Sequence, residues 1–167
     1  MPKILIAQDD GIHADFDGFS DSYNYILPFS KKNKPIKYYY ISENGETIHR
    51  KKEKREKRVS SLGLARLAIQ IFKPKLDALS ETDRNALKTD GYSNKDNIGF
   101  WSDKDEFLQK KTLKFNHFSI QPYKDNENIS YYFYNRGLHD SLNMCLSLLK
   151  YFDDAGTFVI EYNNIEL

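Results

Sequence analysis

Apolar and polar positions along the chain alternate in short blocks rather than in long uniform stretches. Short apolar runs that are rich in Ile, Val, Tyr and Phe and bounded by Pro, Gly, Asn or Asp are typical of β-strands. By this criterion we expect strands at residues 3–8, 36–42, 46–50, 113–121, 129–134 and 157–162. A polar run over residues 9–21 follows the first strand and predicts a solvated loop.

Two pairs of these strands have the spacing of hairpins. Asn44-Gly45 stands between the second and third strands, and this dipeptide favours the positive φ angles of a tight turn. Further on, Pro122 closes the fourth strand, because proline cannot donate to a strand ladder. A polar turn at residues 124–128 then leads into the fifth strand. The sequence therefore predicts two antiparallel hairpins.

Two longer helices are predicted from helical spacing. Apolar residues surround most of a helix over residues 59–73, which indicates burial on more than one side. We expect Pro74 to end or kink this helix. A clear apolar stripe predicts a second helix over residues 138–152, and the polar segment 153–156 breaks it.

Two shorter helices are predicted from their capping residues. Ser80 and Asp83 resemble a capping box, which would start a helix that runs to about Lys88, with Gly91 just past its end. Ser102 is able to cap another helix that ends near Thr112.

Strands in hairpin pairs, separated by helical blocks, favour an α+β fold. We expect a largely antiparallel sheet built from hairpins, with helices packed on it. The chain of 167 residues fits a single domain over residues 1–167. The segment 50–58 consists of Lys, Arg and Glu alone, so it is expected to be solvated.

Composition narrows the function classes. The chain has 25 basic and 24 acidic residues, whereas a dedicated duplex-DNA binder usually carries a basic excess. With a single cysteine, Cys145, no intramolecular disulfide is expected, and its place on an apolar helix face indicates a core thiol. No membrane helix or signal peptide is evident, so we expect a cytoplasmic protein. The richness in Lys, Asn, Ile, Tyr and Phe hints at a bacterial or phage origin.

Two adjacent carboxylates, Asp9 and Asp10, directly follow the first expected strand. Carboxylates in such a place are able to hold a hard divalent cation. The segment 9–14, Asp-Asp-Gly-Ile-His-Ala, resembles the start of the stationary-phase survival nucleotidases, although Asp15-Phe16 stands here where that family has Pro-Gly. The resemblance implies that Asp9 and Asp10 bind Mg or Mn, and that the metal activates water against a phosphate ester. A metal-dependent phosphoesterase is therefore one hypothesis.

The basic run 50–58 supports a second hypothesis, nucleic-acid binding through phosphate contacts. The run has no interleaved aromatic residues on which bases would stack. It would equally suit an acidic protein partner.

The interpretation we favour is a small protein-binding module without catalysis, an inhibitor or antagonist of a partner protein, of the immunity or anti-defence type. Separate acidic and basic segments and surplus Tyr are typical of such surfaces. We assign no catalytic residue, and no cofactor beyond the Mg or Mn of the first hypothesis. The expected partner-binding residues are Asp15, Asp17, Asp21, Lys51, Lys52, Lys54, Arg55, Tyr39 and Tyr132.

Overall fold

The computed structural model of the chain describes residues 1–16, 33–50, 62–80, 82–83, 121–124, 130–133 and 138–165. Within these ranges the elements are β1 (Lys3–Ala7), β2 (Gly11–Ala14), β3 (Pro35–Ile41), β4 (Thr47–His49), α1 (Leu62–Asp77), β5 (Gln121–Lys124), β6 (Ser130–Phe133), α4 (Leu138–Tyr151) and β7 (Thr157–Tyr162).

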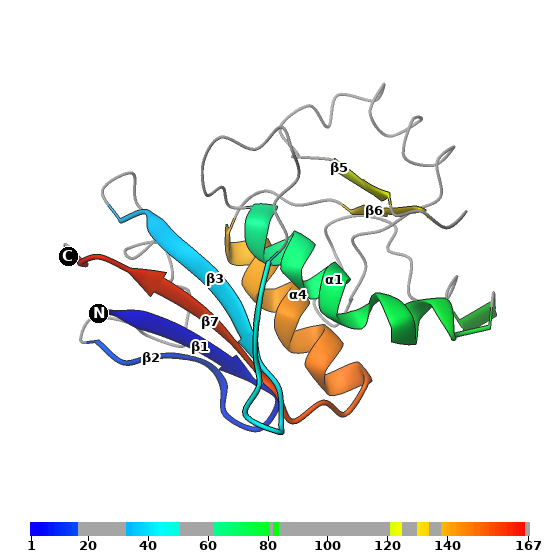
Figure 1. Cartoon of the computed structure of the whole chain (residues 1–167), viewed down its shortest axis with the longest axis horizontal. Coiled ribbons are helices and arrows are strands. Elements are labelled where there is room, and N and C mark those ends of the chain that lie inside the picture. Colours follow the sequence, from blue (N-terminus) through cyan, green and yellow to red (C-terminus); the bar gives the residue numbers. More distant parts are fainter. Residues whose placement is uncertain are drawn as a thin grey trace.

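Five of the strands form one antiparallel sheet in the order β2-β1-β7-β3-β4 (Figure 1). Strand β7 lies at its centre and pairs with β1 on one side and β3 on the other. Strands β5 and β6 form a separate antiparallel pair. The α+β class, the largely antiparallel sheet and the first predicted hairpin are thus confirmed, with Gly45 at a φ of +82° in its turn. Of the second predicted hairpin only the antiparallel pairing is confirmed, because β5 overlaps the expected strand 113–121 at Gln121 alone.

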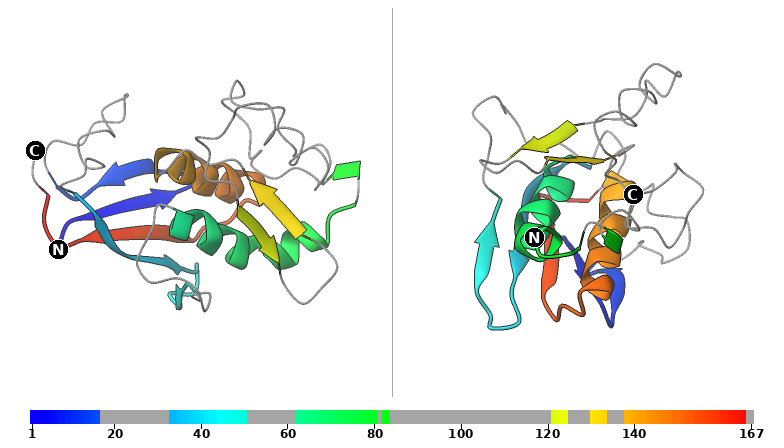
Figure 2. Two further views of the ribbon diagram at one scale, coloured as in Figure 1. Left: turned by 90° about the horizontal axis from the view of Figure 1, so that it is seen from above. Right: turned by 90° about the vertical axis from the view of Figure 1, so that its right-hand side faces the viewer.

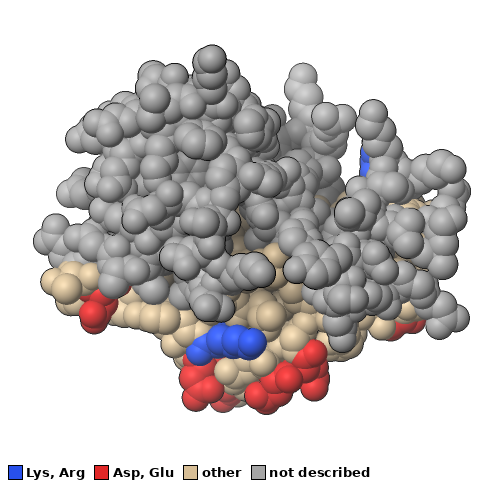
Figure 3. Space-filling model, turned by 180° about the vertical axis from the view of Figure 1, so that it is seen from behind, with Lys and Arg blue, Asp and Glu red and all other residues tan. Residues whose placement is uncertain are grey.

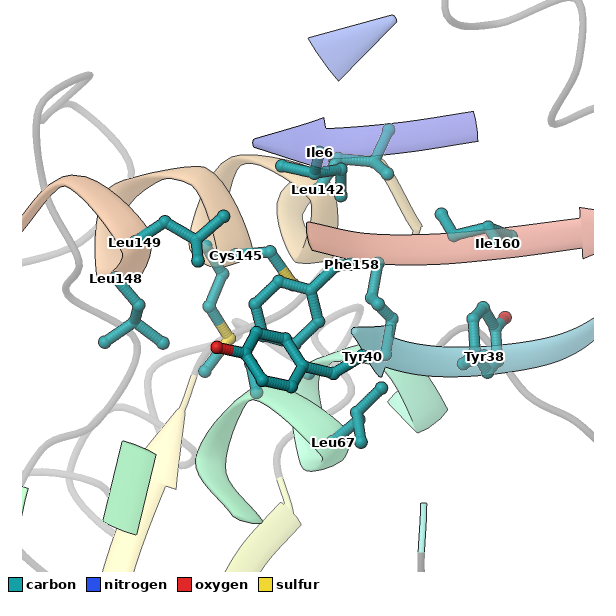
Figure 4. Close-up of a cluster of buried hydrophobic side chains, with 14 of the residues drawn as sticks. Ile6, Tyr38, Tyr40, Leu67, Leu142, Cys145, Leu148, Leu149, Phe158 and Ile160 are labelled. Atoms are coloured by element: carbon teal, nitrogen blue, oxygen red, sulfur yellow. The ribbon is translucent and has the colours of Figure 1, made fainter. Parts of the chain in front are cut away.

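Helices α1 and α4 pack side by side on one face of the five-stranded sheet (Figure 2). Because side chains alternate along a strand, every second residue of the sheet points toward these helices. Tyr38 and Tyr40 are buried on that face, while Tyr39 between them points to the other face. Figure 4 shows this core, with Leu142 of α4 near Ile6 of β1.

Helix α1 confirms the prediction of a helix buried on several sides, because its residues from Gly63 to Ile69 are all buried. Pro74, however, lies inside the helix, which continues to Asp77. Proline costs the helix one backbone N–H, but Leu76 is fully buried and anchors the extra turn. The Ala78 N–H donates to the Pro74 carbonyl at 3.2 Å, which closes that turn.

Two further predictions are corrected by the strands. Part of the expected loop 9–21 is strand β2, which places Ile12 opposite Ile6 of β1. So short a strand with one large apolar residue carries little periodic signal. The expected strand end at Pro122 is also wrong, because β5 contains this proline opposite Tyr132 of β6. In a two-stranded sheet both strands are edges, where proline is tolerated.

The other predictions are either confirmed or lie outside the described residues. Helix α4 and strand β7 match their expected ranges closely. The capping interaction is also present, since the Asp83 N–H donates to the Ser80 hydroxyl at 3.1 Å. Predictions outside the described residues are the rest of that short helix beyond Asp83, the helix from Ser102 to Thr112, the strand residues 113–120 and the basic residues 51–58.

The turn between α4 and β7 depends on one close approach. A Cβ on Gly156 would overlap the Tyr40 phenol. We predict that Gly156→Ala lowers the free energy of unfolding by about 2 kcal/mol, because overpacking forces side chains or backbone to shift. Urea unfolding measures this loss. In a Tyr40→Leu background the same change should cost much less; equal costs in the two backgrounds would contradict the contact.

The buried tyrosines predict a loss of stability at alkaline pH. Burial raises the pKa of Tyr38 and Tyr162 above the ordinary value of 10.0, so both phenols stay neutral in the folded chain. Unfolding exposes both phenols to water, where they ionise near pH 10. The free energy of unfolding is therefore unaffected by these groups below about pH 10 and falls as the pH rises further. We expect the urea midpoint to fall between pH 10 and pH 11, and to fall less in the double variant Tyr38→Phe/Tyr162→Phe. An equally steep fall in that variant would disprove the assignment.

Candidate interaction surface

Three turns of the chain converge on one end of the five-stranded sheet. Strands β1 and β3 both run antiparallel to β7, so they end where β7 begins. Ala7 and Ile41 accordingly lie on either side of Thr157, the first residue of β7. The turn between β1 and β2, the turn between β3 and β4, and the connection from α4 to β7 therefore meet there, at the lower end of the molecule in Figure 1 and in the right-hand view of Figure 2.

Acidic residues dominate this end of the sheet, which we call the acidic end. Two lysines, Lys75 and Lys150, accompany them. The space-filling view shows acidic side chains gathered at the same lower end, beside a basic one (Figure 3). The exposed acidic residues of the three turns are Asp9, Asp10, Glu43, Glu46 and Asp153.

Asp154, the sixth carboxylate of these turns, is largely buried and holds the end together. Its Oδ1 atom accepts hydrogen bonds from the Tyr40 hydroxyl at 2.5 Å and from the Gly156 N–H at 2.7 Å. Its Oδ2 atom lies 3.5 Å from the Lys75 ammonium. Asp154 thereby ties β3, α1 and the start of β7 to one another. These contacts fix the position of β3 and of the start of β7 at the acidic end.

The Lys75 ammonium also lies over two aromatic rings, at 5.7 Å from the centre of Phe72 and 5.8 Å from that of Phe152. These rings stack on each other at 5.4 Å. A cation over an aromatic face is attracted by its negative quadrupole. The Lys75 ammonium therefore interacts with Asp154 and with both rings, although half of the Lys75 side chain is exposed.

Two of the large hydrophobic residues that are exposed in the described part of the chain lie close to the acidic end. Tyr151, in the last turn of α4, is 44% exposed, and its ring meets Phe152 edge-on at 4.9 Å. Ile48 of the edge strand β4 is 38% exposed and pairs with Tyr40. Exposed aromatic and aliphatic side chains beside charged residues are typical of protein-binding surfaces.

Asp9 and Asp10 lie in the tight turn between β1 and β2, where both are exposed. Gly11 has a φ of +71°, and the following Ile, His and Ala of the nucleotidase-like segment belong to strand β2. Among the residues that the structure describes, no group of three or more His, Cys, Asp or Glu side chains is placed to hold a metal ion. A site for Mg or Mn at Asp9 and Asp10 stays a prediction.

Tyr39 lies on the face of the sheet opposite α1 and α4. Its hydroxyl donates to Glu161 Oε1 at 3.2 Å, and the Lys3 ammonium lies 3.5 Å from the same oxygen. Burial and the Glu161 carboxylate raise the pKa of Tyr39. Its ring also contacts His49 at 5.6 Å and lies under the Lys37 ammonium. Tyr39 thus belongs to an ionic cluster that spans three strands.

The remaining expected partner-binding residues are dispersed or undescribed. Asp15 caps the sheet at the other end of β2, where its Oδ1 accepts from the Lys3 N–H at 2.6 Å. Tyr132 is a strand residue of β6, and its side chain is outside the description. The residues outside the described ranges are Asp17, Asp21, Lys51, Lys52, Lys54 and Arg55.

Sequence reasoning did not identify Glu43, Glu46 and Asp153 as site residues. The turns that hold them were predicted, from Asn44-Gly45 and from the end of the second long helix. Their meeting with Asp9 and Asp10 depends on the strand order, which short-range patterns do not encode. The signal available was the acidic character that the three turns share.

Comparisons of the chain with protein-family models, with curated proteins and with solved structures find no match. In the described part of the chain, no helix is long and apolar enough to cross a membrane. The function is therefore inferred from the chain's own residues.

Cys145 provides a test of the core. It is fully buried, as expected, and burial raises the pKa of its thiol. A thiol that is both inaccessible and protonated reacts slowly. We predict that a thiol reagent labels the native chain at least a hundredfold more slowly than the chain in urea, as followed by mass spectrometry. Rapid labelling of the native chain would mean that the helices do not cover this face of the sheet.

Proposed function

We propose that the chain is a protein-binding module that acts as an antagonist of a basic partner protein, and that the acidic end is its docking surface. The observation that supports this proposal most directly is the convergence of five exposed carboxylates from three separate turns. Asp154 links β3 to the connection between α4 and β7, and the pairing of β1 with β7 positions the turn that holds Asp9 and Asp10.

The negative charge of the acidic end indicates what kind of partner surface it would bind. Exposed carboxylates on one side of a molecule attract positive surfaces and repel the phosphates of nucleic acids. Tyr151 is able to pack against an aliphatic or cationic side chain of the partner. A basic protein surface therefore fits this end best.

The dimensions of the acidic end are those of a modest interface. Neighbouring strands lie about 4.8 Å apart, so the five strands span about 20 Å. A specific interface covers roughly 800 Å² on each partner. The turns, together with Tyr151 and the edge strand β4, would form the larger part of such an area.

An antagonist of this kind would act by covering a functional basic surface of its partner. Basic surfaces of proteins commonly bind phosphates or nucleic acids. An acidic surface that docks on such a site blocks it, and long-range attraction makes the encounter fast. The chain's own activity then requires no catalytic residue.

The docking surface is tested with charge variants. The variant Glu43→Gln/Glu46→Gln removes two negative charges from the acidic end, and Asn163→Lys/Asn164→Lys adds two positive charges at the exposed opposite end of β7. Both change the net charge by the same amount. We expect the first variant alone to lower the association rate with a partner, captured from a lysate of the encoding organism at low salt, by about tenfold. Surface plasmon resonance measures these rates.

The outcome that would refute the docking surface is an equal effect of the two variants, because net charge alone would then explain it. Retention of nucleic acid instead of protein would also refute it. Both variants should unfold in urea as the unmodified chain does, since all four side chains are exposed.

A further inference from the structure

A cluster of polar groups lies beside the first turn of α1, toward the end of β7 that is opposite the acidic end. Tyr38 of β3 and Tyr162 of β7 contribute two phenol groups to it from neighbouring strands. Gly63 contributes the first turn of α1, and Arg50 contributes a guanidinium group from the segment after β4. These four residues come from four separate places in the chain.

Gly63 brings the cluster together. A Cβ at this position would lie 2.9 Å from Cε2 of Tyr38 and 3.3 Å from Nε of Arg50. Only a residue without a side chain therefore lets the phenol ring and the guanidinium approach the helix backbone this closely. Larger residues would push both groups away from the first turn of α1.

The two hydroxyl groups of the cluster are buried and unpaired. Tyr38 is 5% exposed and Tyr162 is fully buried, and neither hydroxyl has a hydrogen-bond partner among the residues that the structure describes. Buried polar groups are nearly always hydrogen-bonded, because an unpaired one loses its hydration without compensation. Two such hydroxyls on adjacent strands indicate that something other than the described side chains pairs with them.

We propose that this cluster, which we call the tyrosine site, binds a small oxyanion through the Tyr38 and Tyr162 hydroxyls, the Arg50 guanidinium and the backbone N–H groups in the first turn of α1. Every one of these groups is able to donate a hydrogen bond. The first four N–H groups of a helix lack partners within the helix, and its dipole places positive charge at the same end.

The protonation states agree with an anionic ligand. Burial raises the pKa of both phenols, so both keep the proton that they would donate. The positive charge of Arg50 opposes this rise at Tyr38, which places the guanidinium within electrostatic reach of that hydroxyl. Arg50 itself is only half-buried, so its side chain connects the site to the surface.

Titration of the full chain with anions tests the tyrosine site. Inorganic phosphate, sulfate and acetate are each added at constant ionic strength, with chloride as the reference, and the dissociation constant is measured by calorimetry. We expect saturable binding of one equivalent of phosphate or acetate and a dissociation constant at least fivefold higher for Tyr162→Phe. Preference for phosphate and sulfate would identify a phosphoryl-type ligand, and preference for acetate would identify a carboxylate.

The matched control is Tyr40→Phe, because the Tyr40 hydroxyl is already paired with Asp154 and belongs to the same strand as Tyr38. This variant should bind the anion as the unmodified chain does. A second readout is thermal unfolding. Without anion, Tyr162→Phe should unfold at the same temperature as the unmodified chain or higher, since the change removes an unpaired hydroxyl. At saturating anion it should unfold at a lower temperature.

Two results would overturn the proposal. One is equal stabilisation of the unmodified chain by all anions including chloride, and the other is equal binding in the unmodified chain and in Tyr162→Phe. If Tyr162→Phe does not fold, Tyr38→Phe serves as the second variant, with the same expected rise in the dissociation constant.

Discussion

The whole sheet depends on the pairing of strand β7 with two partners. Strands β1 and β3 belong to separate hairpins, and β7 alone joins them, with backbone hydrogen bonds on both sides. Five of its six residues, Phe158 to Tyr162, are buried, so β7 is enclosed by its neighbours as well as by the helices. Even the one charged residue among them, Glu161, is paired with Lys3 and Tyr39 from the flanking strands. Without β7 the five-stranded sheet would separate into the hairpins β1–β2 and β3–β4.

The same arrangement produces both candidate sites. Because β7 is antiparallel to β1 and β3, its first residue meets their two turns and the acidic end forms there. Its last residue, Tyr162, lies beside Tyr38 under α1 and helps to build the tyrosine site at the other end. Asp154 stabilises the first site through the Tyr40 hydroxyl, and in the second Gly63 lets the Tyr38 ring and the Arg50 guanidinium approach the helix backbone. The two ends of β7 thus lie at candidate sites for ligands of opposite charge, a basic partner at its first residue and an oxyanion at its last.

Local patterns predicted much of the fold and little of the candidate sites. The Asn44-Gly45 turn, the apolar stripe of α4 and the β-branched run of β7 are short-range signals, and each gave the right element. Strand β2 escaped prediction because its pairing with β1, and not its own sequence, makes it a strand. Pro74 shows the same effect, since burial of Leu76 outweighs a local helix breaker. Proximity of Glu43 to Asp153, or of Tyr38 to Tyr162, follows from strand order, which depends on contacts between distant residues.

The central place of β7 has a consequence for the order in which the chain is made. During synthesis the first 156 residues leave the ribosome before β7 does, and until then the hairpins β1–β2 and β3–β4 have no strand to join them. Their inner edges therefore present unpaired backbone groups to any other chain nearby, which is the usual setting for misassembly. The pairing of β1 with β7 joins segments that are far apart in the sequence, and sheets built on such distant contacts fold slowly. Assembly of the five-stranded sheet therefore has to wait until β7 has left the ribosome.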